Sequence, residues 1–64
     1  MELNVNGEAY SFEGTLLQEL LEQLKAPAHV AVVINGSVVP RTERAQRTLQ
    51  DQDQVDILTL AGGG

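Results

Sequence analysis

The sequence predicts an α+β fold in which a mixed sheet of four to five strands packs on one helix. Three observations indicate this fold. An alternating segment with an Asn-Gly turn comes first, a leucine-rich amphipathic segment follows, and further β-rich segments come last. The 64 residues make one domain at most. We expect this domain to span residues 1–60, with a glycine tail at 61–64.

The chain begins with a predicted β-hairpin. Met1, Leu3 and Val5 alternate with polar residues, which is typical of a half-buried strand. Asn6-Gly7 follows and favours a tight hairpin turn, because both turn positions need positive φ. Residues 9–12 alternate again and complete the hairpin.

The next segment predicts the helix. Thr15 and Gln18 have the spacing of a capping box. Five leucines after Thr15 fall on one face at helical spacing, with glutamines and glutamates on the other. Lys25 comes near the end of the helix, where a cation suits the helix dipole, and Pro27 stops it.

Residues 30–34 predict a third, central strand, in which the even-numbered side chains face the helix and Ala31 and Val33 face away. Asn35-Gly36 then predicts a tight turn into a short strand at 37–39.

A polar segment at 42–48 predicts a loop or one helical turn, which Leu49 anchors to the core. A turn at 51–54 leads into the last strand, 55–60. This order of elements is that of the β-grasp arrangement, in which the first and last strands are parallel neighbours. The helix supplies the crossover that parallel strands need.

Composition excludes several classes of function. Without cysteine there is no disulfide, thiolate zinc site or cysteine nucleophile. The net charge of −5 argues against nucleic-acid binding and favours encounter with basic partners, although the acids alone could serve solubility. No signal peptide or membrane-spanning run is visible, so we expect a cytoplasmic protein that does not bind a membrane.

No self-contained active site is predicted. His29 has no cysteine or other orienting partner beside it, so a structural or solvated histidine is the better interpretation. Asp51, Asp53 and Asp56 do not match a calcium loop, because the twelfth position from Asp51 is Gly62 instead of glutamate. No glycine-rich phosphate loop is present, so we expect no bound metal, nucleotide or cofactor.

The three glycines at the C-terminus are the most unusual feature. A glycine tail adds nothing to the stability of a fold, since glycine loses the most entropy on ordering. It can, however, lie in a narrow channel and present the carboxylate of Gly64 to another protein. A frayed end or an artificial extension is the alternative. The sheet face away from the helix carries Leu58, Leu60 and Val33, which predict an apolar patch for a partner. The alternative is that a small protein simply exposes some apolar side chains.

The chain resembles the ThiS family of sulfur carriers of thiamin biosynthesis, within the ubiquitin-like β-grasp superfamily. The resemblance covers nearly the whole chain. It rests on the opening Asn6-Gly7 turn, the helix leucines, the segment 32–41 ending in Val-Pro-Arg, the residues before the last strand, and Gly63-Gly64. The family turn usually reads Asp-Gly-Asp, whereas Gln52 stands in place of the glycine here.

The resemblance implies a carrier that is not itself an enzyme. A ThiF-like adenylating enzyme would use ATP and magnesium to activate the Gly64 carboxylate. A persulfide donor would convert it to a thiocarboxylate, and a ThiG-like thiazole synthase would take the sulfur. Gly62 and Gly63 would give access, and Val33, Leu58, Leu60 and Arg41 would contact partners, although Arg41 could instead bond loop carbonyls or a carboxylate. We expect a monomer when the carrier is free.

Three alternatives stay open on the sequence. The first is a molybdopterin-type sulfur carrier on the same fold. The second is a protein modifier that forms isopeptide bonds, and the third is a plain interaction module whose tail is incidental.

Overall fold

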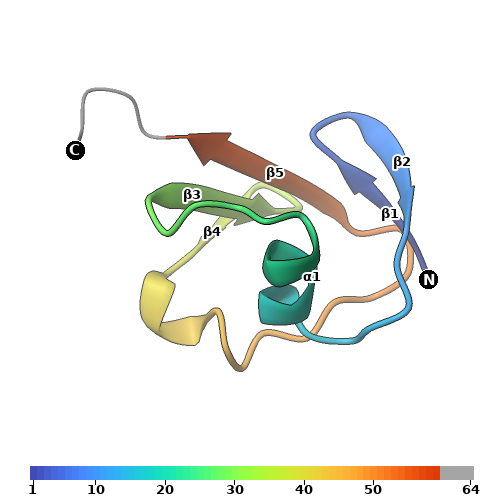
Figure 1. Cartoon of the computed structure of the whole chain (residues 1–64). Coiled ribbons are helices and arrows are strands. Elements are labelled where there is room, and N and C mark those ends of the chain that lie inside the picture. Colours follow the sequence, from blue (N-terminus) through green and yellow to red (C-terminus); the bar gives the residue numbers. More distant parts are fainter. Residues whose placement is uncertain (60–64) are drawn as a thin grey trace.

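The protein, described here by a computed structural model for residues 1–59, forms a five-stranded mixed sheet with the strand order β2-β1-β5-β3-β4 (Figure 1). The expectations for Leu60, Gly62, Gly63 and Gly64 lie outside these residues. The elements are β1 (Glu2–Val5), β2 (Glu8–Ser11), α1 (Leu17–Gln23), β3 (Val30–Ile34), β4 (Ser37–Val39), the 3-10 helix η1 (Arg41–Glu43) and β5 (Gln54–Thr59).

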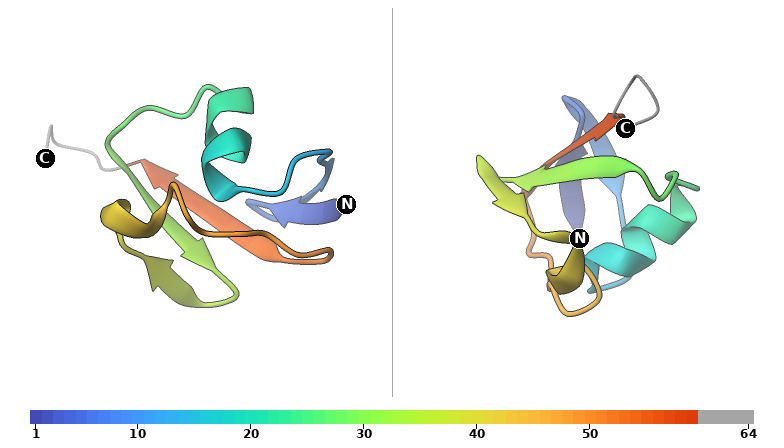
Figure 2. Two further views of the ribbon diagram at one scale, coloured as in Figure 1. Left: turned by 90° about the horizontal axis from the view of Figure 1, so that it is seen from below. Right: turned by 90° about the vertical axis from the view of Figure 1, so that its left-hand side faces the viewer.

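The pairing of β1 with β5 confirms the β-grasp arrangement. These strands come from the two ends of the described chain and run parallel, with Asn4 opposite Gln54 and Val5 opposite Val55. The pairs β1–β2, β3–β4 and β3–β5 are antiparallel. A parallel pair needs a long crossover, and here the crossover includes α1, which lies on one side of the twisted sheet (Figure 2).

Both predicted Asn-Gly turns are confirmed. Asn6 and Gly7 have φ of 51° and 84°, and Asn35 and Gly36 have φ of 52° and 87°. Two successive positive φ angles give the type of turn that matches the twist of a hairpin, which is why the strands on either side pair directly.

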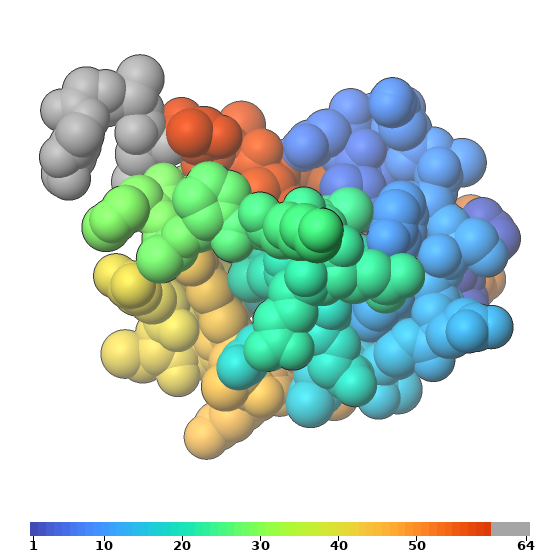
Figure 3. All heavy atoms as spheres, viewed as in Figure 1, coloured from blue at the N-terminus to red at the C-terminus, as the bar shows by residue number. Residues whose placement is uncertain are grey.

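The core lies between α1 and the sheet. In β3 the buried side chains are Val30, Val32 and Ile34, as the alternation predicts. Leu49 is also buried, so the long connection after β4 is anchored as expected. In the space-filling view, α1 and the connection to β3 occupy the middle of the visible face (Figure 3). The other buried apolar side chains are Leu3, Val5, Phe12, Leu17, Leu20, Val39 and Val55.

The predicted capping box of Thr15 and Gln18 is wrong by one residue. The N-cap is Leu16, and the side chain that reaches back is that of Glu19, whose Oε1 accepts hydrogen bonds from the backbone amides of Thr15 and Leu16 at 3.1 and 2.9 Å. The cause is a contact distant in sequence. Leu16 forms a β-bridge with Thr48, which holds the chain extended for one residue longer than the local pattern suggests.

The helix ends before Pro27 through a Schellman motif. The amide of Ala26 donates to the carbonyl of Leu21 at 2.9 Å, and that of Lys25 donates to Glu22 at 3.1 Å. Lys25 takes the left-handed conformation, with φ of 57°, at the position where helices usually have glycine. Lys25 is therefore near the helix terminus as predicted, but in a strained backbone conformation.

Lys25→Gly is expected to raise the free energy of unfolding by about 1 kcal/mol, because glycine adopts positive φ without a steric cost. Urea denaturation measures the change. Lys25→Ala is the matched control, since it removes the same charge and keeps a Cβ. Equal stability of the two variants would contradict the assignment of strain to Lys25.

The hydrogen bonds to Glu19 also predict a pH dependence. The backbone amides of Leu16 and Thr15 lower the pKa of the Glu19 carboxyl below its usual 4.5. A carboxyl with a lowered pKa in the folded state stabilises the fold at higher pH. This contribution is lost as the pH falls below 4.5 and through the folded pKa.

Glu19→Gln should therefore destabilise the protein at pH 7 and have less effect at acid pH, since the lost interaction is already absent there. Thermal unfolding followed at several pH values between neutral and acid checks this. Glu13→Gln is the control, because it removes the same charge from a side chain with no hydrogen bond among residues 1–59. A parallel pH profile for wild type and Glu19→Gln would count against the role of Glu19.

Candidate functional site

Strand β5 is the last element of the described chain, and it directly precedes the glycine-rich end in the sequence. It lies between β1 and β3, and its pairing with β3 continues to Thr59, which is opposite Val30. On the other side, the side chain of Asn6 extends the contact beyond the end of β1, because its Oδ1 accepts a hydrogen bond from the amide of Ile57 at 2.7 Å. The last described residue therefore has a defined place on the sheet.

A second cluster holds the start of β5. The buried carboxylate of Asp53 accepts hydrogen bonds from Asn35 Nδ2 at 3.0 Å and from the amide of Gln50 at 2.9 Å. The Oδ1 of Asn35 in turn accepts from the amide of Gln54 at 2.9 Å. In the turn between Gln50 and Asp53, Gln52 has φ of 72°. It therefore takes the left-handed conformation that the family's usual glycine would favour.

The outer face of the sheet, away from α1, carries exposed apolar side chains. Leu58 is 54% exposed, and its strand partner is Ala31. Val33 lies opposite Asp56 on the same pair of strands, which makes it a diagonal neighbour of Leu58. The structure thus brings together two of the three residues predicted for the apolar patch, and the third, Leu60, lies outside residues 1–59.

Val38 belongs to this face and was missed by the sequence reasoning. It is 70% exposed and pairs directly with Val33. The alternation within β4 could have found it, since Val39 is buried and its neighbour must point to the other face. We call Val33, Val38 and Leu58 the outer patch.

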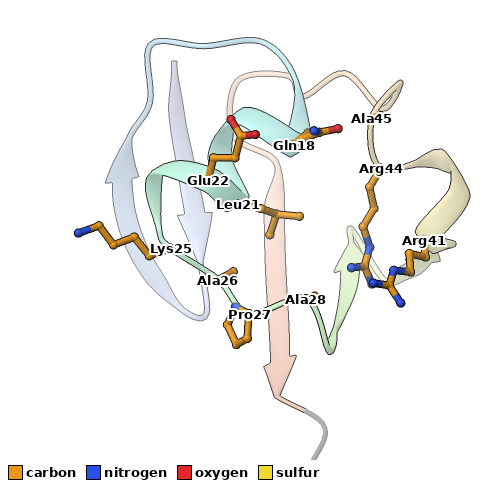
Figure 4. Close-up of a pocket in the computed structure, with 10 residues that line it drawn as sticks. All are labelled: Gln18, Leu21, Glu22, Lys25, Ala26, Pro27, Ala28, Arg41, Arg44 and Ala45. Carbon is orange, nitrogen blue, oxygen red and sulfur yellow. The ribbon is translucent and has the colours of Figure 1, made fainter. Parts of the chain in front are cut away.

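The structure does not bring Arg41 to the outer patch. Arg41 is exposed in η1 and lines a groove against α1 instead (Figure 4). Arg44 makes the carbonyl contact that the sequence suggested for Arg41, because its Nη2 donates a hydrogen bond to the carbonyl oxygen of Val30. No signal in the sequence separates these two arginines.

The titratable side chains offer no metal centre within the described part of the chain. Residues 1–59 contain no cluster of three histidine, aspartate or glutamate side chains placed to hold an ion. His29 is exposed at the start of β3. The carboxylate of Asp51 accepts from the amide of Glu2 at 2.6 Å and from Gln52 Nε2, and these hydrogen bonds lower its pKa. None of the helices over residues 1–59 has the length and apolar character of a bilayer span.

The parallel β1–β5 pair, the helical crossover and the C-terminal strand next to an apolar face define a ubiquitin-like β-grasp protein. The sequence model of the ThiS family matches residues 3–64, and the chain belongs to this family. The match favours a thiamin carrier over the molybdopterin-type carrier that the residues alone left open.

Solved structures and curated relatives agree with this assignment. A crystal structure of thiamine biosynthesis protein ThiS from Geobacter metallireducens covers 100% of both chains at 38% identity, with a TM-score of 0.86. The sulfur carrier protein ThiS of Escherichia coli K12 is 42% identical over 52 residues, 80% of this chain and 79% of that protein. The family function is sulfur carriage in thiamin biosynthesis, which is a carrier role and not catalysis.

A longer relative carries a similar segment. The thiazole synthase of Magnetococcus marinus is 41% identical over 66 aligned positions, which include 100% of this chain and 20% of that protein. The chain thus spans about a fifth of the length of this relative, whereas it covers 95% of the sulfur carrier protein ThiS of Thermus thermophilus, at 36% identity.

Proposed function

We propose that the chain carries sulfur for the thiazole ring of thiamin as a thiocarboxylate on Gly64. The observation that carries the proposal is the family match, which extends through residue 64 on a chain that ends in three glycines. Gly62 and Gly63 would provide the slim approach to a partner's active site, because glycine has no side chain to obstruct a narrow channel.

The proposed cycle begins with activation. A carboxylate resists nucleophiles because of its negative charge, so a ThiF-like partner with ATP and magnesium would convert Gly64 to an acyl-adenylate and release pyrophosphate. The terminal sulfur of a persulfide donor would then attack the acyl carbon and displace AMP. A thiol would cleave the S–S bond of the resulting acyl disulfide, which leaves the thiocarboxylate on Gly64 and releases the donor as a disulfide. The partners supply the catalytic groups, and the carrier supplies the acyl carbon and the surface that positions it. Since the cycle consumes ATP, we place it in the cytoplasm.

A ThiG-like thiazole synthase is the proposed acceptor of the sulfur. The thiazole synthase of Magnetococcus marinus includes a segment similar to this whole chain, which supports a carrier and a synthase that work together. A carrier joined to its acceptor meets it at a high effective concentration, and a separate carrier must find it by diffusion. We expect the carrier to be a monomer when it is free and to dock on the synthase.

The outer patch is the proposed docking surface, together with Leu60. Leu58 lies on β5, the strand that leads into the tail, so a partner that receives the tail must approach this end of β5. Val38 and the half-buried Val33 extend this surface across β3 and β4, with Asp56 opposite Val33 on the same face. Large exposed apolar side chains that are contiguous are typical of partner contacts.

Intact-mass spectrometry tests the chemistry. Incubation with a ThiF-like enzyme, ATP, magnesium and a sulfur donor should add the mass difference between sulfur and oxygen. Deletion of Gly63 and Gly64 should abolish this gain and leave the fold unchanged. If the enzyme is active on another ThiS protein and the mass of this chain stays constant, the thiocarboxylate proposal is wrong. Covalent adducts on other proteins would indicate a modifier.

Leu58→Glu should weaken binding to the thiazole synthase by about tenfold, because it places a charge within an apolar contact. Its side chain is 54% exposed, so the stability of the free carrier should change little. Ala9→Glu is the matched control, since it adds the same charge at an exposed residue of β2, at the opposite edge of the sheet from β3 and β4. Isothermal titration calorimetry measures the dissociation constant of each variant from the synthase. Equal dissociation constants would exclude the outer patch as the docking surface.

A further inference from the structure

Most of the basic residues of this acidic chain line one groove. The sequence has nine acidic residues and only four basic ones. Three of the four, Lys25, Arg41 and Arg44, line a single groove of about 440 Å³ between α1 and η1, and the fourth, Arg47, lies outside it (Figure 4). The groove also has apolar walls, formed by Leu21, Pro27 and three alanines. We call it the cationic groove.

The two arginines of the groove are not neutralised within the described part of the chain. Neither forms an ion pair with residues 1–59, although Glu22 also lines the groove. Arg44 donates one hydrogen bond to Val30, and its buried Nε has no partner among residues 1–59. Figure 4 shows the side chains of Arg41 and Arg44 extending from the same segment on one side of the groove, whereas the side chain of Lys25, on the other side, extends away from the two arginines. Guanidinium groups in this state have donors left for an anion.

The position of the groove relates it to the tail. The connection that follows α1 forms one wall and leads into Val30, which is the pairing partner of Thr59. Arg44 contacts the carbonyl of this same Val30. The groove therefore lies at the end of the sheet where β5 ends, but on the α1 side, whereas the outer patch lies on the opposite face.

We infer that the cationic groove binds an acidic segment of the thiazole synthase that receives the tail. This inference rests on the proposed function. Arginine forms paired hydrogen bonds with carboxylates, and Arg41 is exposed for such a contact. The apolar walls suit the aliphatic parts of a peptide better than they suit an inorganic anion, and the groove is larger than such an anion.

The contact would set the orientation of docking. A chain of net charge −5 attracts basic surfaces from many directions, and these attractions do not define one orientation. A single cationic groove facing an acidic segment adds an attraction in one orientation and a repulsion in most others. With the outer patch on the other face, the synthase would hold the end of β5 from both sides.

Binding of the unmodified chain to the thiazole synthase tests this inference. Arg41→Glu should raise the dissociation constant about tenfold and reduce its dependence on salt, because it reverses a charge in the contact. Arg47→Glu is the matched control, since it makes the same charge change outside the groove. We expect it to change the dissociation constant less than about twofold.

The outcomes separate the inference from the proposed function. If wild type does not bind the synthase, the proposed partner is wrong. If wild type binds and the Arg41→Glu and Arg47→Glu variants have equal dissociation constants, the synthase is still the partner, but the cationic groove does not contact it.

Cross-linking then identifies the occupant. A carbodiimide couples a lysine amine directly to a carboxylate as an amide. The Arg41→Lys variant should therefore cross-link through residue 41 to an aspartate or glutamate of the synthase. If the Arg41→Lys variant binds the synthase but cross-links through residue 41 no better than an Arg47→Lys control does through residue 47, no acidic segment occupies the groove.

Discussion

The parallel contact between β1 and β5 is the constraint on which the rest of the structure depends. Only two residue pairs form it, Asn4 with Gln54 and Val5 with Val55. The backbone bonds from Asn4 and Asn6 to β5 and the turn before it, each 2.9 Å, and the Asn6 side chain reinforce this short contact. Because β5 also pairs with β3, it joins the opening hairpin to the second half of the sheet. Without that strand, each half of the sheet would expose its apolar side to water.

The sequence predicted the elements well and their local contacts less well. Alternation in β3 and the two Asn-Gly turns depend on neighbouring residues, so they can be found from the sequence alone. The start of α1 could not, because the bridge between Leu16 and Thr48 joins distant segments. The separate roles of Arg41 and Arg44 were equally hidden, since both follow β4 in a polar segment without periodicity. Val38 was within reach, because alternation in a short strand is a local signal.

The candidate site illustrates how a small protein can serve several partners without an active site of its own. The reacting carboxylate is proposed for the tail, and the folded part contributes an apolar face and a groove of opposite charge to the rest of the surface. These surfaces come from different elements, so each can change in sequence without disturbing the other. Such independence would allow the strength of docking and its orientation to change separately.

The central place of β5 has a consequence for how the protein is made. This strand comes last in the described chain, yet it lies in the middle of the sheet. During synthesis, a ribosome-bound chain that lacks it has no closed core, and contacts between distant segments form slowly. The domain can therefore fold only after β5 has left the ribosome. By the same argument, a single proteolytic cut in the connection between β4 and β5 would place the central strand on a different fragment from both strands that it pairs with.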